Sequence, residues 1–182
     1  MAAHIEDLPQ FVYHPDPLKT GSVRASDEVC VCCLRQRGYI YSGPVFAVEE
    51  LTGPLCPWCV ADGTAADRFE ADFSDAYLAP AGIGTEVVST ITNRTPGFSG
   101  WQQERWLFHC GDGAAFLGVV GARELEGDHT TLESLRQELS ESRWPAEQVD
   151  QYLASLDRDG QPTAYLFECR SCRTHLAYSD FT

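Results

Sequence analysis

The sequence lacks long apolar runs and has little positive charge. Its longest apolar stretch, Ala114–Val120, is seven residues long, whereas a membrane-spanning helix needs about 20. Lysine and arginine number 13 against 27 aspartates and glutamates, which gives a formal net charge of −14. Proteins that hold nucleic acid or an anionic membrane present basic surfaces. We therefore expect neither direct nucleic-acid binding nor membrane attachment.

A secretory signal is also missing, because Met1–Asp7 has no basic head followed by an apolar segment. We therefore expect a cytoplasmic protein, whose thiols stay reduced. Eight cysteines are nevertheless present, so they require an explanation other than disulfides. Metal binding is the first explanation and redox chemistry is the second.

The composition does support a folded core. The 182 residues are 43% hydrophobic, which suffices for one compact unit. We expect an α+β fold with a treble-clef or zinc-ribbon-like N-terminal half and a C-terminal half of β-hairpins and helices. The expected division is an irregular lead-in over 1–27 that packs on the core, a zinc-binding hairpin–helix lobe over 28–80, and an α+β lobe over 81–182.

In the N-terminal half, residues 38–48 predict a hairpin of two β-rich runs around Ser42-Gly43-Pro44. Phe11 and Tyr13 alternate as in a short edge strand. A helix is predicted over 57–71, since Pro57 suits a first helical turn. The spacing of the apolar residues favours a second helix over 85–93.

In the C-terminal half, residues 106–110 and 115–120 predict a hairpin that turns at Gly111–Gly113. A helix over 131–142 follows, with Thr130 and Glu133 as its capping box. The next helix is expected from Pro145, with Gly160 closing it. A last hairpin is expected from strands 163–168 and 174–178, which flank a Cys-x-x-Cys turn.

Two Cys-x-x-Cys pairs flank the first predicted hairpin. A tetrahedral zinc ion takes four soft ligands, and each such turn places two sulfurs on one side. We therefore predict a structural zinc site at Cys30, Cys33, Cys56 and Cys59. Cys32 is a spare thiol or a replacement for Cys30 or Cys33.

The alternative for the second pair is redox chemistry. Cys56-Pro57-Trp58-Cys59 at a helix start resembles the dithiol of a glutaredoxin-like protein, in which the helix N-terminus lowers the pKa of the first thiol. Such a dithiol should follow a buried parallel strand. Here Glu49–Pro54, a turn-like stretch, precedes it, so metal binding is favoured.

A second cluster is predicted from Cys110, Cys169 and Cys172. Cys169 and Cys172 lie in the turn of the last predicted hairpin, where zinc knuckles occur. His109 is the candidate fourth ligand, and His129 or His175 are alternatives. Without metal, these cysteines would pack as small hydrophobic side chains.

Several strings resemble the CbrC family. They span nearly the whole chain and include Phe11–Pro17, Leu55–Gly63, Arg94–Glu104 and Trp106-x-x-His109-Cys110. The resemblance implies little chemistry, although some members carry a name that refers to tolerance of colicin E2, a nuclease toxin. The family tends to have a further cysteine at the position of Ala114. Its absence here implies that the second site is weakened or that its fourth ligand is a histidine.

Other features of the sequence are candidates for binding or catalysis. Trp101, Gln102, Gln103 and Glu104 form a candidate binding surface, since aromatic and polar side chains are common anchors, although Trp101 and Trp106 also suit a core. Glu104 with His109 would make an acid/base pair, but nothing in the sequence sets their geometry. Acidic residues gather over 62–75 and 124–141, as on a solvated face or on a surface that meets a cationic protein.

These observations favour a non-enzymatic, zinc-stabilised acidic binding protein. Its expected partner is a protein, such as a basic nuclease-type toxin against which it confers tolerance or immunity, since charge-steered docking would block the toxin's substrate cleft. The alternative is an enzyme. It would be a thiol redox protein at Cys56 and Cys59, or a metal-dependent hydrolase at Cys110, Cys169 and Cys172.

Overall fold

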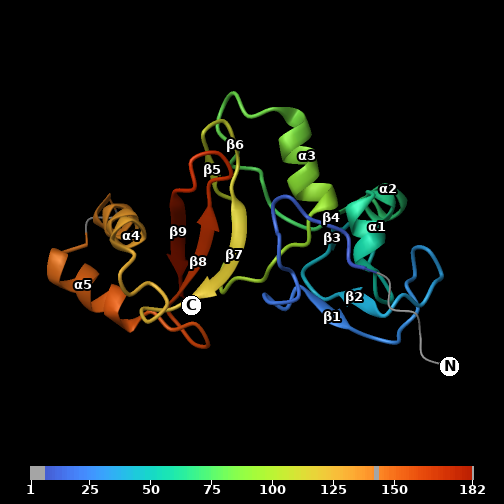
Figure 1. The fold of residues 1–182 in the computed structure, drawn as a ribbon, viewed down its shortest axis with the longest axis horizontal. Helices are drawn as coiled ribbons and strands as arrows, with labels where there is room; N and C mark the ends of the chain where they lie inside the picture. Colours follow the sequence, from blue (N-terminus) through green and yellow to red (C-terminus); the bar gives the residue numbers. More distant parts are fainter. Residues whose placement is uncertain (1–6, 142–143, 182) are drawn as a thin grey trace.

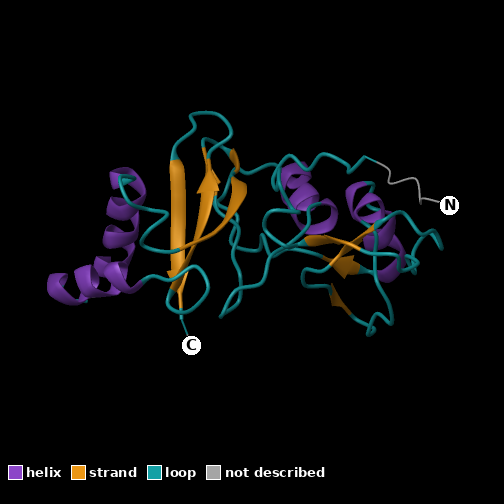
Figure 2. Ribbon diagram, turned by 60° about the horizontal axis from the view of Figure 1, so that its bottom comes forward, coloured by secondary structure: helices purple, strands orange, loops and turns teal. Residues whose placement is uncertain are grey.

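The fold is α+β and is seen in a computed structural model that describes residues 7–141 and 144–181. A three-stranded antiparallel sheet stands between a helical layer on one side and the N-terminal elements on the other (Figures 1 and 2). Among the described helices, none combines the length and apolar character that crossing a bilayer requires.

The N-terminal elements are short. They are β1 (Val23–Ala25), β2 (Tyr39–Tyr41), β3 (Phe46–Ala47), α1 (Pro57–Ala61), α2 (Thr64–Phe69) and β4 (Ala71–Asp72). The later elements are α3 (Thr85–Arg94), β5 (Phe108–His109), β6 (Asp112–Gly113), β7 (Ala115–Val120), α4 (His129–Glu141), α5 (Ala146–Ser155), β8 (Thr163–Glu168) and β9 (His175–Asp180). The predicted helix at 85–93, the two later helices and the final hairpin are present. The predicted end of the last helix at Gly160 is wrong, because α5 ends at Ser155 with Leu156 as its C-cap. Residue 142 of the helix predicted over 131–142 lies outside the described residues.

The predicted hairpin over 38–48 is wrong, although both of its arms are strands. β2 pairs with β1, and β3 pairs with β4. The Tyr41 ring separates the arms, since its hydroxyl donates to the carbonyl of Pro44 at 2.6 Å and a Cβ on Gly43 would overlap the ring. β1 lies in the expected irregular lead-in, whereas Phe11 and Tyr13 are buried without forming a strand.

The predicted single helix over 57–71 is two helices. The left-handed Gly63 (φ +82°) separates α1 from α2, and Asp62 accepts a hydrogen bond from the Thr64 backbone at 2.9 Å. A second left-handed residue, Glu70 (φ +47°), ends α2 and turns the chain into β4. Glycine adopts this conformation without steric cost, which is why the helix breaks there.

Two details of the C-terminal half also differ from prediction. β5 pairs with β6 through a two-residue turn, and β7 pairs with β8, so 106–110 and 115–120 do not form one hairpin. The six-residue β8 offers β7 a longer ladder than β5 could. The cap of α4 is Asp128 rather than Thr130, because its carboxylate accepts from the backbone and hydroxyl of Thr131 at 3.1 and 2.8 Å.

The central sheet is buried on both faces. On one face, Phe116, Tyr165 and Phe167 pack with the loop that carries Phe98, whose ring stacks on Phe116 at 3.9 Å. On the other face, α4 and α5 cover side chains such as Ala164. A bulge at Gly118 (φ +131°) shifts the β7 register by one residue. A third apolar cluster fills the N-terminal part, and the expected boundaries at 27 and 80 stay predictions.

His14 is a buried histidine for which the sequence analysis assigned no role. Its side chain is 0% exposed, and its ring lies 2.6 Å from the Pro96 carbonyl and 2.7 Å from the Thr20 hydroxyl. Burial lowers the pKa of His14 to about 4. The neutral ring therefore joins the N-terminal segment to the 95–100 loop.

This burial predicts a stability loss in mild acid. An unfolded histidine takes up a proton below a pKa of about 6.5, whereas folded His14 stays neutral until about 4. Its contribution is thus fully present above pH 6.5 and is lost as the pH falls towards 4, by about 3 kcal/mol. Urea unfolding of the wild type and His14→Gln should show a steeper loss for the wild type. Parallel pH profiles of the two proteins would contradict the assignment.

Candidate metal centres

The structure brings together the first predicted set of cysteines. The sulfurs of Cys30, Cys33, Cys56 and Cys59 all lie within 4.8 Å of one another. The separations are 4.0 Å for Cys30–Cys59, 3.7 Å for Cys33–Cys56 and 3.5 Å for Cys56–Cys59. Sulfurs around a tetrahedral zinc ion, each about 2.3 Å from the metal, lie about 3.8 Å apart. The set could hold such an ion.

Local backbone geometry explains this convergence. Cys30 and Cys33 lie in a tight turn that ends at the left-handed Leu34 (φ +58°), whose N–H donates to the Cys30 carbonyl at 2.8 Å. Cys56 is the N-cap of α1 and Cys59 is in its first turn. The Cys56 N–H also donates to the Cys30 sulfur at 3.2 Å. A turn followed later by a helix start is compatible with the expected zinc-ribbon-like half.

Hydrogen bonds and burial shift the pKa values of Cys30, Cys56 and Cys59 in this set. Hydrogen bonding from the Cys56 thiol lowers the pKa of Cys30 to about 4. The same bond, together with burial, raises the pKa of Cys56, and burial raises that of Cys59. One thiolate is thus held beside buried thiols, and a divalent ion would replace the remaining protons.

Cys32 lies beside this set but outside it. Its side chain is buried, and burial raises the pKa of its thiol. Its carbonyl accepts a hydrogen bond from the Arg68 guanidinium. In a turn of this kind the first and fourth residues converge, which leaves the third position free to pack in the core.

The setting of Cys56 and Cys59 differs from that of a redox dithiol. Leu55, which precedes them, makes only an isolated antiparallel bridge to Tyr41, and every strand pair in the described residues is antiparallel. All eight cysteines are free thiols. The parallel strand that a glutaredoxin-like motif requires is thus not found before α1.

The second predicted set also converges. The donor atoms of His109, Cys110, Cys169 and Cys172 lie within 4.8 Å of one another, and His109 Nδ1 is 3.3 Å from the sulfurs of both Cys110 and Cys172. Cys169 is buried, His109 is half-buried, and Cys110 and Cys172 are exposed. This set could also hold a metal ion.

Hydrogen bonds favour the thiolate forms of Cys169 and Cys172 in this second set. The Cys172 N–H lowers the pKa of Cys169, and the Thr174 hydroxyl, 3.2 Å from the Cys172 sulfur, lowers the pKa of Cys172. Sharing protons with those two sulfurs raises the pKa of Cys110 to about 11. Deprotonated sulfurs are the form in which cysteine binds metals.

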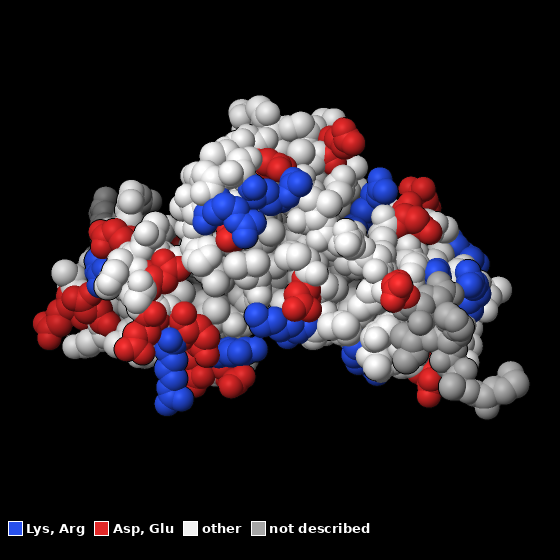
Figure 3. Space-filling view, in the orientation of Figure 1, with Lys and Arg blue, Asp and Glu red and all other residues white. Residues whose placement is uncertain are grey.

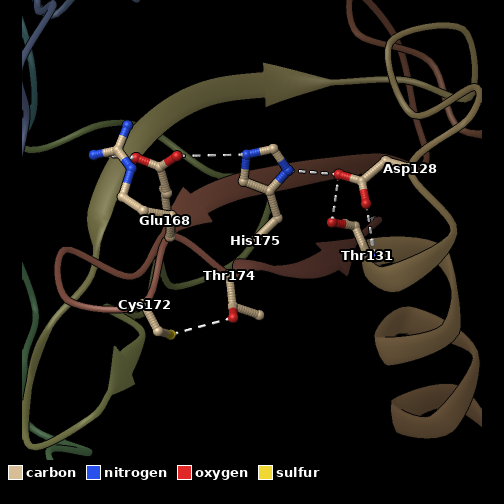
Figure 4. Close-up of polar contacts among 7 residues, drawn as sticks. Asp128, Thr131, Glu168, Cys172, Thr174 and His175 are labelled. Atoms are coloured by element: carbon tan, nitrogen blue, oxygen red, sulfur yellow. Dashed lines mark hydrogen bonds and ion pairs between the residues drawn. The ribbon is translucent and has the colours of Figure 1, made fainter.

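Of the alternative histidine ligands, His175 is occupied by carboxylates. Its Nδ1 lies 2.6 Å from Asp128 and its Nε2 lies 3.8 Å from Glu168 (Figure 4). Burial opposes ionisation of Asp128, but hydrogen bonds from His175 and Thr131 outweigh it and lower the carboxyl pKa. His129 is at the start of α4 and is not among the four donors. Among the described residues, His109 is therefore the nitrogen donor of the second set.

The segment 101–103 of the candidate binding surface is held by hydrogen bonds to other parts of the chain. Trp101 is 45% exposed, and its indole donates to the Gly160 carbonyl at 3.1 Å. Gln102 donates to Asp180 and Phe181, and Gln103 lies 3.4 Å from Asp75. These three side chains face solvent, and their role in binding stays a prediction.

Glu104 lies inside the protein rather than on that surface. It is 6% exposed, and its Oε1 has no hydrogen-bond partner in the described part of the chain. Burial, reinforced by the nearby Asp75 carboxylate, raises its pKa. His109 meanwhile faces the sulfurs, so the structure forms no acid/base pair between the two.

Comparisons with known proteins agree over nearly the whole chain. The relatives include UPF0167 protein Mb2317 of Mycobacterium bovis, 52% identical over 97% of this chain and 95% of the relative. UPF0167 protein PA1536 of Pseudomonas aeruginosa is 44% identical over 96% of this chain and 98% of the relative. No solved structure matches significantly. The CbrC name does not occur among these descriptions and stays a prediction. Because the model of an uncharacterised protein family, UPF0167, matches residues 8–181, the chain belongs to that family.

Proposed function

We propose that the protein is a zinc-stabilised recognition protein that binds a basic protein partner. The first centre would hold a structural zinc ion. Four sulfurs complete a tetrahedron and leave no position for a substrate or water, and Cys30, Cys56 and Cys59 are at most 3% exposed. This closed, buried arrangement supports an architectural role rather than catalysis.

The observation that carries the recognition role is a groove beside this centre. The groove, of about 520 Å³, lies between the first cysteine turn, the 48–52 loop and α2. Its apolar lining is Val31, Val48, Leu51 and Phe69. Val48 is 87% exposed, which leaves an apolar side chain available to a partner.

The charged lining of the groove is mainly acidic. Four carboxylates line it, those of Glu49, Glu50, Asp67 and Glu70, against one guanidinium, that of Arg68, which leaves a formal charge of −3. Arg68 is turned towards the protein, because it donates to the Cys32 carbonyl and lies over the Phe69 ring. A lining of apolar and acidic side chains is complementary to a segment that carries both apolar and basic side chains.

The overall negative charge of the protein also favours encounter with a basic partner. Figure 3 shows acidic side chains interspersed with basic ones, with acidic clusters over the α4–α5 end. The net charge of −14 would speed encounter with a cationic protein. A basic nuclease toxin is the specific partner we propose, since an acidic surface competes with nucleic acid for its substrate cleft. The eight free thiols fit the reducing cytoplasm.

Binding to the isolated nuclease domain of colicin E2 tests this function. We expect a complex whose affinity falls steeply with salt. Glu49→Lys combined with Glu50→Lys should weaken it by at least about tenfold. The matched control, Glu126→Lys with Asp159→Lys, changes net charge equally at exposed positions outside the groove and should have a much smaller effect.

The measurement is isothermal titration calorimetry at low and physiological salt. Absence of a complex at low salt would refute the toxin as partner. Equal weakening by both double variants would show that only net charge matters, and the groove would then have no specific role.

A further inference from the structure

We infer that His109, Cys110, Cys169 and Cys172 bind a second zinc ion, one that exchanges readily with solution. The inference does not depend on the recognition role above. It combines the geometry of the four donors with their exposure, which is opposite to that of the first centre.

The second cysteine turn repeats the backbone geometry of the first. Arg173, left-handed at φ +63°, donates its N–H to the Cys169 carbonyl at 2.9 Å, as Leu34 does to the Cys30 carbonyl at 2.8 Å. The Cys169 N–H donates to the Thr174 carbonyl at 2.8 Å, as Cys30 does to Arg35 at 3.0 Å. The same backbone conformation therefore directs two sulfurs to one side of each cysteine turn.

The opposite pair of donors comes from the β5–β6 turn. Cys110 (φ +50°) and Gly111 (φ +75°) are both left-handed, as a two-residue hairpin of this type requires. Asparagine, aspartate and glycine are the usual residues there, and cysteine costs more in backbone strain. A thiol in this conformation, 3.3 Å from His109 Nδ1, is explained if it is a metal ligand.

The donor set selects zinc. Three thiolates and one imidazole are a common structural zinc combination, whereas calcium and magnesium prefer oxygen. Nitrogen and sulfur donors bound to one zinc ion lie about 3.5 Å apart, and His109 Nδ1 lies 3.3 Å from two of the sulfurs. The site would carry one net negative charge, and Arg170 is held nearby by its ion pair with Asp112.

Ala114 does not belong to the second set. It is 0% exposed and packs among aromatic side chains, so position 114 faces the core of the sheet. Among the described residues, His109 is the fourth donor that converges with the three sulfurs.

Exposure distinguishes the two centres. Cys110 and Cys172 face solvent, so a chelator or a metal donor can reach the ion without local unfolding. Loss of the ion would release the β5–β6 turn from the β8–β9 turn. The first centre, with three nearly inaccessible sulfurs, can release metal only when the N-terminal cluster opens.

Metal content and release rates test the inference. The wild type should contain two zinc ions per chain and release them to a chromogenic chelator in two phases, separated by at least about tenfold in rate. His109→Gln and Cys172→Ser should each contain one ion and lose the fast phase. His175→Gln is the matched control, because His175 neighbours the site but bonds to Asp128, and it should keep both ions.

His109→Cys separates loss of a ligand from misfolding caused by substitution at position 109. It supplies a fourth sulfur, so it should retain two metals, and its cobalt-loaded form should shift from a mixed sulfur–nitrogen spectrum towards an all-sulfur one. A single ion in the wild type would overturn the inference. So would two ions in both His109→Gln and Cys172→Ser, or a single release phase. None of these results bears on the groove experiment.

Discussion

Cys56→Ser is expected to unfold the N-terminal part of the protein. Cys56 supplies a sulfur to the first centre, 3.7 Å from the Cys33 sulfur and 3.5 Å from the Cys59 sulfur, and serine removes that ligand. Structural zinc contributes on the order of 10 kcal/mol in small domains, more than the remaining short strands can replace. The apolar cluster around these cysteines would therefore lose its cross-link between residues 30–33 and 56–59.

Hydrogen exchange and zinc analysis measure this effect. Amides of β1, β2, α1 and α2 should lose protection, while the β7–β9 sheet keeps at least part of its own. Cys32→Ser is the matched control, since Cys32 is a buried thiol outside the quartet and its loss should leave the zinc content unchanged. A Cys56→Ser protein that retains native protection without metal would refute the structural role.

Gly97→Ala is expected to destabilise the protein by more than about 4 kcal/mol. A Cβ at this position would overlap the carbonyl oxygen of Phe73, which is backbone and cannot rotate away. The Gly97 N–H donates to the Tyr41 hydroxyl at 3.1 Å, and the next residue, Phe98, stacks in the sheet cluster. Tyr41 belongs to the N-terminal apolar cluster and Phe98 to the aromatic cluster on the central sheet. Movement of Gly97 would therefore disturb both of these clusters.

Denaturant unfolding with a matched glycine separates this clash from a general effect. Gly84 precedes α3 with an ordinary φ of −62°, and an added Cβ there meets nothing within 4 Å. Gly84→Ala should therefore change stability by less than about 1 kcal/mol. Similar losses in the two variants would show that the junction tolerates movement and that the contact is unimportant.

The spacing of the cysteines made both metal-ligand sets predictable from the sequence. The pairing of the strands could not be predicted in this way. Cys30–Cys33 and Cys169–Cys172 each fix a turn locally, and four sulfurs have few ways to meet. Strands such as Phe46–Ala47 are two residues long, so their sequence carries no alternation that specifies a partner. β3 pairs with β4 because the left-handed Glu70 ends α2 and turns the chain into β4.

Features that depend on tertiary packing could not be predicted from the sequence either. His14 hydrogen-bonds to Pro96, which is 82 residues away in the chain, and to Thr20, and no pattern in the sequence indicates the contact with Pro96. The groove forms because the 48–52 loop lies opposite α2; its acidic and apolar residues alone resemble an ordinary surface loop. The sequence predicts Glu104 on a binding surface with Trp101 to Gln103, but tertiary contacts bury it.

The two centres differ in the length of chain that each one closes. Cys30 and Cys59 are 29 residues apart, and His109 and Cys172 are 63 apart. Roughly doubling the length of a loop adds only about 0.6 kcal/mol to the free-energy cost of closing it. The two centres therefore differ little in the equilibrium cost of bringing their ligands together. Synthesis on the ribosome does, because folding proceeds from the N-terminus as the chain emerges. The zinc ion proposed for the first centre would then be captured while β7, β8 and β9 are still untranslated, and the later half would fold against an already assembled neighbour.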